Sequence, residues 1–191
     1  MTRMRMPAPG EERSVALALV NTRFEDSRGT VDELTDQDAA GAWLVAHAGA
    51  PRALSLSPRD LERVDALRES IREVLSALME ERTVDDAALS RLAATTAAAP
   101  GSARLTRQRG ALVRDWVVAR GSPLERTLAE IANDAIALTG DERRKHLAEC
   151  GAPDCTRLLL RDHNRRHWCS TRCGDRVRAS RYRERHSSEP A

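Results

Sequence analysis

The stretch from Cys150 to Cys173, CGAPDCTRLLLRDHNRRHWCSTRC, holds all four cysteines of this chain of 191 residues. Four residues separate Cys150 from Cys155, thirteen more lead to Cys169, and three separate Cys169 from Cys173. Two close pairs joined by a longer loop are typical of a site in which four thiolates surround one metal ion, because a longer loop costs little further closure entropy. The sequence therefore predicts one structural Zn²⁺ per chain, bound by these four cysteines.

Other ligand sets stay open at this point. The gap in the first pair is longer than in the commonest zinc knuckle, so His163 and His167 are candidate ligands of a mixed site; the alternative is that both are surface residues. Iron held by four thiolates is chemically allowed, although nothing else in the sequence indicates redox chemistry. A site closed by four protein ligands leaves no position for water, which indicates a structural rather than a catalytic metal.

The residues around the cysteines predict a small fold. Gly151 and Pro153 lie inside the first pair, as a tight knuckle requires, and residues 156–161 and 165–168 flank a turn at Asp162-His163-Asn164. Ser170 is a candidate N-cap for a helix that begins there. This order of knuckle, hairpin and helix predicts a treble-clef-like module. Its roughly 40 residues bury too little surface to fold alone, so metal binding would supply the folding free energy.

The helix expected over residues 170–186, STRCGDRVRASRYRERH, is rich in arginine. At about 100° per residue, Cys173, Val177 and Ser180 share its inner face. Each of two arginine rows would follow one phosphate strand, while the small residues between them enter the major groove of DNA. The alternative is a solvated helix in a chain whose basic residues are nearly all arginine. The two rows are Arg172, Arg176 and Arg183, and Arg178, Arg181 and Arg185.

The rest of the chain predicts a mainly α fold. Hydrophobic residues make up 41% of the chain and aromatic residues only 3%, so the core is aliphatic, which favours helices. Residues 14–24 are apolar and form either a short helix or a buried strand. The sequence period changes to two on both sides of Gly110, which predicts a small β-hairpin over residues 103–119. Apolar residues recur at helical spacing in residues 36–48, 57–78, 84–98 and 124–140.

Charge and composition place the domain boundaries. Residues 1–140 hold 18 basic and 21 acidic residues, whereas residues 141–191 hold 13 basic and 8 acidic residues. We therefore expect the chain to divide at Gly140, and the basic part to bind a polyanionic partner. The expected parts are a disordered start at 1–12, a helical domain at 13–140, a zinc module at 141–186 and a disordered tail at 187–191.

Several classes of protein are not indicated. No apolar stretch approaches the ~20 residues of a membrane span, and the polar start lacks the apolar region of a secretory signal. Cysteines confined to one short stretch do not resemble a disulfide framework. We therefore expect a cytoplasmic protein with reduced thiols and no membrane partner. The sequence also lacks a phosphate-binding glycine loop, an H-E-x-x-H motif and a G-x-S-x-G motif, so we expect no enzymatic activity.

The motifs around the cysteines resemble the CGNR zinc finger, which is named for its Cys-Gly-Asn-Arg run. The resemblance rests on Cys150 and Cys155, on residues 166–170 (RHWCS) and on residues 173–176 (CGDR). In that family the finger follows a mostly helical domain called ABATE, and the proteins are described as stress-induced transcription regulators. Motifs in the N-terminal part resemble ABATE as well: Leu19-Val20-Asn21-Thr22, Asp32-Glu33-Leu34, Ala42-Trp43-Leu44 and Leu67-Arg68-Glu69.

The resemblance implies a role for each part. The four cysteines would be the zinc ligands, and the last helix would contact DNA. The ABATE-like domain would sense a small-molecule effector or form a homodimer. One residue departs from the family pattern, because Asp175 stands where the family has asparagine. Its carboxylate would either repel phosphate or hold Arg172 or Arg178 in place through an ion pair.

One further candidate site lies near the N-terminus. Asn21, Thr22 and Arg23 are polar and follow an apolar run, so they are candidates for lining a ligand pocket. The alternative is a set of hydrogen bonds at the end of a helix. The sequence as a whole favours a zinc-finger transcription regulator that binds DNA through its C-terminal helix. The second hypothesis is an adaptor whose zinc module docks onto an acidic protein partner.

Overall fold

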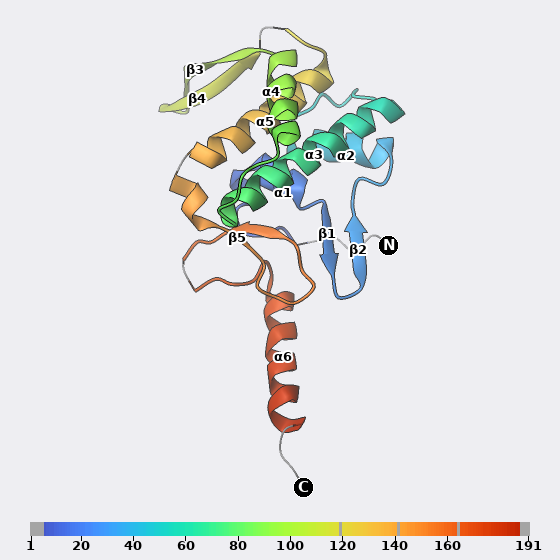
Figure 1. Ribbon diagram of the computed structural model, residues 1–191. Helices are drawn as coiled ribbons and strands as arrows, with labels where there is room; N and C mark the ends of the chain where they lie inside the picture. Colours follow the sequence, from blue (N-terminus) through green and yellow to red (C-terminus); the bar gives the residue numbers. More distant parts are fainter. Residues whose placement is uncertain (1–5, 119, 141, 164, 188–191) are drawn as a thin grey trace.

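The computed structural model describes residues 6–118, 120–140, 142–163 and 165–187. Within these residues the fold is mainly α, as predicted, with three small antiparallel hairpins (Figure 1). The helices are α1 (Val15–Val20), α2 (Gln37–His47), α3 (Pro58–Met79), α4 (Asp86–Ala98), α5 (Pro123–Gly140) and α6 (Thr171–Ser187), with short 3₁₀ helices η1 (Glu11–Arg13) and η2 (Glu142–His146). The hairpins pair β1 (Arg23–Asp26) with β2 (Gly29–Asp32), β3 (Gly101–Gln108) with β4 (Ala111–Val118), and β5 (Leu147–Glu149) with β6 (Leu158–Leu160). Among the helices of the described residues, none combines the length and the apolar composition of a membrane-spanning segment.

Helix α1 lies at the centre of the helical body and contacts both α3 and α5. The apolar run at residues 14–24 thus forms a helix, one of the two structures expected, and residues 16–20 are buried. Ser14 begins the helix, because its hydroxyl accepts a hydrogen bond from the Leu17 backbone N–H at 3.2 Å. The same hydroxyl donates to Asp134 of α5 at 2.7 Å, which fixes the start of α1 against that helix.

Helix α3 begins as the sequence predicts. Ser57 and Asp60 form a reciprocal capping box, and Pro58 occupies the first turn. An apolar stripe, including Leu67 and Ile71, faces the core. One charged residue shares this buried surface: the Arg68 guanidinium is fully buried and forms ion pairs with Asp32 of β2 and Asp65. Arg68 therefore fastens the β1–β2 hairpin to α3. That hairpin was not expected from the sequence.

The hairpin predicted around Gly110 is confirmed. Gln108 lies opposite Ala111, so Arg109 and Gly110 form a two-residue turn. Both turn residues have positive φ, 48° and 86°, which is the backbone that a tight hairpin turn requires. The β3–β4 hairpin extends from the top of the body, between α4 and α5 in the chain (Figure 1). It pairs with no other strand in the described part of the structure.

The prediction of a disordered start over residues 1–12 is wrong for residues 6–12. Ala8 is buried beside the cysteines, and the Pro9 carbonyl accepts a hydrogen bond from the Leu160 backbone N–H at 2.8 Å. Gly10 has a φ of 97°, and a Cβ there would come within 2.6 Å of the Leu160 side chain. Contacts with residues about 150 positions later order this segment. Its local composition does not contain this information, so it wrongly indicated disorder. Residues 1–5 and 188–191 lie outside the described residues, and Ser187 ends α6.

The predicted pairing of residues 156–161 with residues 165–168 is also wrong. Instead, β6 pairs with β5, with Leu158 opposite Glu149 and Leu160 opposite Leu147. The cysteine knuckle connects these two strands. The observed hairpin therefore lies earlier in the chain than the turn at Asp162-His163-Asn164, around which we expected a hairpin. All three β6 leucines are buried, because the body covers one face and the cysteine cluster covers the other. The observed order is a hairpin, a loop and a helix, and a treble-clef arrangement is not confirmed.

Candidate metal centre and basic helix

The four cysteine sulfurs gather in one buried cluster. All four Sγ atoms lie within 4.8 Å of one another, and none forms a disulfide. Cys155 Sγ is 3.8 Å from Cys169 Sγ and 3.8 Å from Cys173 Sγ, and the last two are 3.6 Å apart. Metal–sulfur bonds of about 2.3 Å in a tetrahedron place sulfurs about 3.8 Å apart. The cluster therefore has the dimensions of a four-thiolate metal site.

Three different segments carry these ligands. Cys150 follows β5 and Cys155 precedes β6, whereas Cys169 and Cys173 lie on either side of the start of α6. Ser170 caps that helix as predicted, because its hydroxyl accepts a hydrogen bond from the Cys173 backbone N–H at 3.3 Å. A hydrogen bond of 2.7 Å, in which the Gly151 N–H donates to the His167 carbonyl, holds the knuckle closed. A Cβ at Gly151 would lie 3.2 Å from that carbonyl oxygen, so glycine permits this close approach.

Arg157 is a part of this site that sequence reasoning missed. Its guanidinium, only 5% exposed, forms an ion pair of 2.9 Å with Glu11, which is equally buried. It also donates to the Met6 carbonyl at 3.0 Å and lies 3.8 Å from Cys169 Sγ. A cation beside a thiolate ligand offsets part of the negative charge that four thiolates bring to a divalent ion. The available signal was an arginine two positions after Cys155 and immediately before a run of three leucines.

The thiols of the cluster influence one another's ionisation. Hydrogen bonding to Cys150 raises the pKa of the Cys155 and Cys169 thiols above the ordinary value. The same contacts lower the pKa of Cys150, whose sulfur also accepts a hydrogen bond from the Cys169 backbone N–H at 3.3 Å. Because the four sulfurs lie close together, ionisation of one thiol disfavours ionisation of its neighbours, so the metal-free cluster retains some of its protons. Binding of a metal to this site would release those protons.

The histidines considered as rival ligands lie apart from the cluster. His163 and His167 are exposed, and the group of possible metal ligands found among the described residues consists of the four cysteines. Asn164, in the predicted turn, lies outside the described residues. The donor set that fits this site is therefore all sulfur, which suits zinc and other thiolate-binding metals.

The candidate ligand residues near the N-terminus have partners within the protein. Asn21, fully buried, donates its side-chain amide to the Leu158 carbonyl and accepts from the Leu158 N–H, both at 2.8 Å. Thr22 donates to the Leu19 carbonyl at 2.7 Å, and Arg23 pairs with Asp32 at 2.8 Å. These contacts correspond to the alternative, a hydrogen-bonded helix end. A ligand role for the three residues stays a prediction.

The four-cysteine module is joined to the helical body through several contacts of its β6 strand and the residues before it. Leu158 and Leu160 belong to the same apolar core as α1, α3 and α5. Arg72 of α3 donates to the Thr156 carbonyl at 3.0 Å and to the Val20 carbonyl at 2.8 Å. The residues that follow α5 therefore share one core with the helical body. The expected division of the chain at Gly140 stays a prediction.

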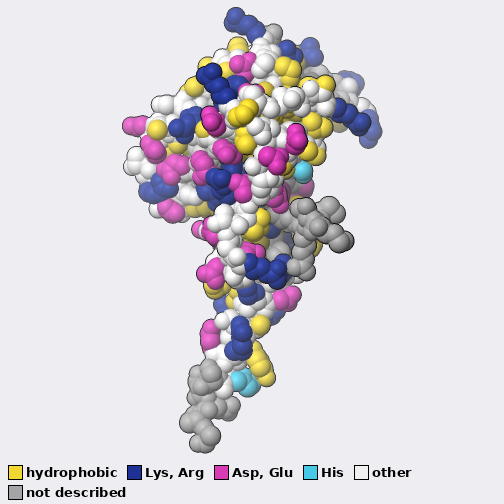
Figure 2. Space-filling view, turned by 90° about the vertical axis from the view of Figure 1, so that its right-hand side faces the viewer, with side chains coloured by type: hydrophobic (Ala, Val, Ile, Leu, Met, Phe, Trp, Pro, Cys, Tyr) yellow, Lys and Arg dark blue, Asp and Glu magenta, His cyan; other side chains and the backbone are white. Residues whose placement is uncertain are grey.

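Helix α6 is anchored only at its N-terminal end. Cys173 and Val177 are buried on the expected inner face, whereas the residues from Arg181 to His186 are all exposed. A Cβ at Gly174 would come within 3.0 Å of the Trp168 ring, so this glycine lets the ring pack on the helix. Beyond that point the helix projects from the molecule, with basic side chains along it (Figures 1 and 2).

The six arginines of the two predicted rows fall into two groups. Arg176 faces the protein, because it donates to the Pro153 carbonyl at 2.7 Å and to the Ser27 hydroxyl at 2.9 Å. Arg178 pairs with Asp175 at 2.6 Å and lies over the Trp168 ring. Of the two roles considered for Asp175, the structure thus shows the ion pair. The other four are exposed, and no acidic side chain of the described residues pairs with them: Arg172, Arg181, Arg183 and Arg185.

The fold and the cysteine cluster together define a two-part protein, a helical domain followed by a small four-cysteine finger. Comparison with family models identifies both parts. The ABATE model, described as "Putative stress-induced transcription regulator", matches residues 13–142, and the CGNR zinc finger model matches residues 146–186. The chain therefore belongs to the ABATE family and carries a CGNR zinc finger, which confirms the resemblance found in the sequence. A search of curated proteins found no match.

Proposed function

We propose that this protein is a transcription regulator that binds duplex DNA through the exposed part of α6. The observation that carries the proposal is the combination of a fixed helix start with a projecting basic end. Four exposed arginines of α6 have no acidic partner among the described residues, so they are available to phosphate oxygens. A helix of this kind has the right diameter for the major groove. The ABATE domain would carry the signal, by binding an effector or by forming a homodimer.

The proposal includes one Zn²⁺ held by Cys150, Cys155, Cys169 and Cys173. When bound, the ion supplies folding free energy rather than chemistry, because a closed four-thiolate site leaves no position for a reacting group. Iron in the same four-sulfur site would give similar sulfur separations, so elemental analysis and sulfur-edge spectroscopy are the measurements that identify the metal. About one zinc per chain is expected. Purified protein with four free thiols and no metal would contradict this part of the proposal.

The DNA contact is tested by measuring affinity for a duplex against salt concentration, with metal-loaded full-length protein. If four phosphates are engaged, the slope of log K against log salt is about −4. The variant Arg181→Gln/Arg185→Gln should flatten the slope by about 2 and leave the metal bound. The matched control is Arg28→Gln/Arg52→Gln, which removes two exposed arginines from other parts of the surface and should leave the slope unchanged.

The second candidate function is an adaptor that docks onto an acidic protein. The same exposed arginines support it, since a cluster of carboxylates attracts them as phosphate does. The salt series separates the two functions. If neither the wild type nor the control binds duplex DNA at low salt, while an acidic protein partner binds and the α6 variant loses it, the adaptor is the better explanation.

A further inference from the structure

The β3–β4 hairpin carries exposed leucines, whereas most leucines elsewhere in the fold are buried. Leu105 and Leu112 are 69% and 67% exposed, more than any other large hydrophobic side chain in the described part of the chain. Arg107 lies opposite Leu112, and Leu105 is two positions before Arg107 on β3, so the three share one face of the hairpin. Two leucines and an arginine thus form an outward face that contributes nothing to the core.

The same hairpin is strongly basic. Residues 101–118 hold four arginines and one acidic residue, Asp115. Arg104 lies opposite Asp115 in the strand register, whereas Arg107 lies opposite Leu112 and Arg109 is in the turn. Among the described residues, no acidic side chain forms an ion pair with Arg107 or Arg109. The outer end of the hairpin therefore presents cations that are available to an anionic partner.

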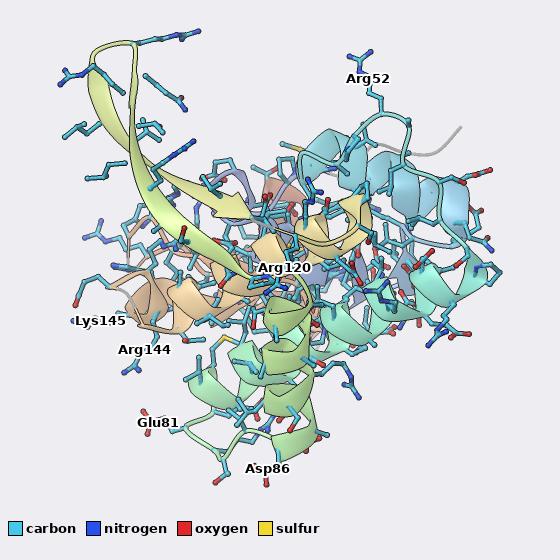
Figure 3. All side chains as sticks on the ribbon, turned by 90° about the horizontal axis from the view of Figure 1, so that it is seen from above. Arg52, Glu81, Asp86, Arg120, Arg144 and Lys145 are labelled. Carbon is cyan, nitrogen blue, oxygen red and sulfur yellow. The ribbon has the colours of Figure 1, made fainter. Side chains whose placement is uncertain are left out.

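The base of the hairpin is firmly placed. Ala99, just before β3, is 1% exposed, and Gly121, just after β4, lies against it. Gly121 has a φ of 112°, and a Cβ there would come 3.0 Å from the Ala99 Cβ, so glycine allows the two ends of the hairpin to close onto the body. Seen from above, the hairpin extends beyond the helical body, with Arg120 near its base (Figure 3). It has the form of an arm with a fixed base and an open outer part.

We propose that the β3–β4 arm is a second DNA-binding surface. A two-stranded β-ribbon fits the major groove of duplex DNA. Arg107 and Arg109 would bind phosphate oxygens, while Leu105 and Leu112 contact apolar parts of the groove such as thymine methyl groups. Charge selects this occupant over a second copy of the chain, because pairing two such arms would bring four arginines of each together.

The position of the arm gives the proposal a consequence. The arm and α6 lie at opposite ends of the molecule, with the helical body between them (Figure 1). One chain would therefore hold two separate duplex segments. This consequence rests on the proposed function of α6, whereas DNA binding by the arm does not depend on it.

The test uses metal-loaded full-length protein and the variant Arg107→Gln/Arg109→Asn, in which asparagine suits the positive φ of the turn. In a salt series with a duplex, the arm is measured in the Arg181→Gln/Arg185→Gln background, where this variant should flatten the remaining log-log slope by about 2, and the control Arg28→Gln/Arg52→Gln in the same background should not. Leu105→Ser/Leu112→Ser should lower affinity by roughly tenfold at fixed salt and keep the slope. A slope in the arm variant equal to that of the control would overturn the proposal.

Combining the arm and α6 variants separates the two proposals. If α6 alone binds DNA, the arm variant behaves as wild type and the α6 variant loses binding, which sinks the arm proposal only. If the arm alone binds, the reverse pattern holds. If both bind, wild-type protein should capture a labelled duplex on an immobilised one, and either variant should lose this bridging. A dimer in sedimentation that Leu105→Ser/Leu112→Ser dissociates, with DNA affinity unchanged, would assign the arm to a second copy and overturn the proposal.

Discussion

The β3–β4 and β5–β6 hairpins are both two-stranded, and both carry leucines, but the leucines meet opposite surroundings. Leu105 and Leu112 of β3–β4 are about two-thirds exposed, whereas Leu158, Leu159 and Leu160 of β6 are buried. The difference does not come from the strands themselves. It arises because β6 has the helical core on one face and the cysteine cluster on the other, while the β3–β4 arm has protein only at its base.

The comparison indicates different uses for the two hairpins. Because β6 packs against the helical core on one face and the cysteine cluster on the other, we expect β5–β6 to couple the metal site to the body. A ribbon with open faces can change its contacts without disturbing the fold. Variants at the first hairpin should therefore affect binding, and variants at the second should affect stability.

The largest expected effect is that of metal removal. Metal binding at structural thiolate sites contributes on the order of 10 kcal/mol, and β6 lies between the cysteines and the core. Chelation should therefore remove hydrogen-exchange protection from β5–β6 and reduce it in α1, while β3–β4 keeps its own level. Mass spectrometry of exchange with and without chelator measures this, and restored zinc should reverse it. Unchanged protection in α1 would show that the shared core does not couple the two parts.

The next effect compares the same substitution in the two hairpins. Leu158→Ala leaves a cavity in the core and should lower the free energy of unfolding by about 2–5 kcal/mol. Leu105→Ala, at an exposed position, should change it by no more than about 0.5 kcal/mol. Denaturant unfolding of metal-loaded protein gives both values. Similar values for the two variants would mean that the exposed arm is packed in solution.

A smaller effect is expected at the contact between α1 and β6. Asn21→Ala leaves the buried N–H and carbonyl of Leu158 without their side-chain partner, which should cost about 1–3 kcal/mol. The matched control is Asn133→Ala on α5, because within the described residues the half-buried Asn133 amide donates only to the Ala129 carbonyl of its own helix. Thermal unfolding should show a clear loss for the first variant and little for the second. Equal losses would argue against a special role for Asn21.

The smallest effect concerns the third hairpin, β1–β2, which is held by ion pairs. Partial burial alone would raise the pKa of Asp32, but hydrogen bonds and charge from Arg68 hold it below the ordinary value of 3.8. The stabilisation is therefore present above pH 3.8 and is lost as the pH falls through the lower folded pKa. Asp32→Asn should lower the Tm at neutral pH, and its difference from wild type should shrink toward pH 3. A difference independent of pH would mean that charge is not the cause.

Much of the helical body could be predicted from local sequence. Ser57 and Pro58 are neighbours in the sequence and together mark the start of α3. The change of period at Gly110 marks the β3–β4 hairpin directly. The four cysteines were identified by spacing alone, because their chemistry restricts what they can do together. In each case the determining interactions lie close together in the sequence.

The rest depended on contacts between distant residues. The three leucines of β6 suit a strand, but no local feature indicates that residues 147–149 are the partner rather than residues 165–168. No local feature of the sequence marks Glu11 and Arg157 as buried, because the ion pair that accounts for their burial joins residues 146 positions apart. For the same reason the order of residues 6–12 could not be found: the atoms that hold this segment belong to the finger.

Asn21 bears on how such proteins can be recombined. Its amide contacts the Leu158 backbone as a neighbouring strand would, so the ABATE domain of this chain supplies part of the scaffold on which its finger closes. A finger transplanted onto another carrier would lose that support together with the pocket for Leu158 and Leu160. Chimaeras between relatives should therefore exchange α1 and β6 together, because these two segments contact each other directly. A chimaera joined at Gly140 would separate them.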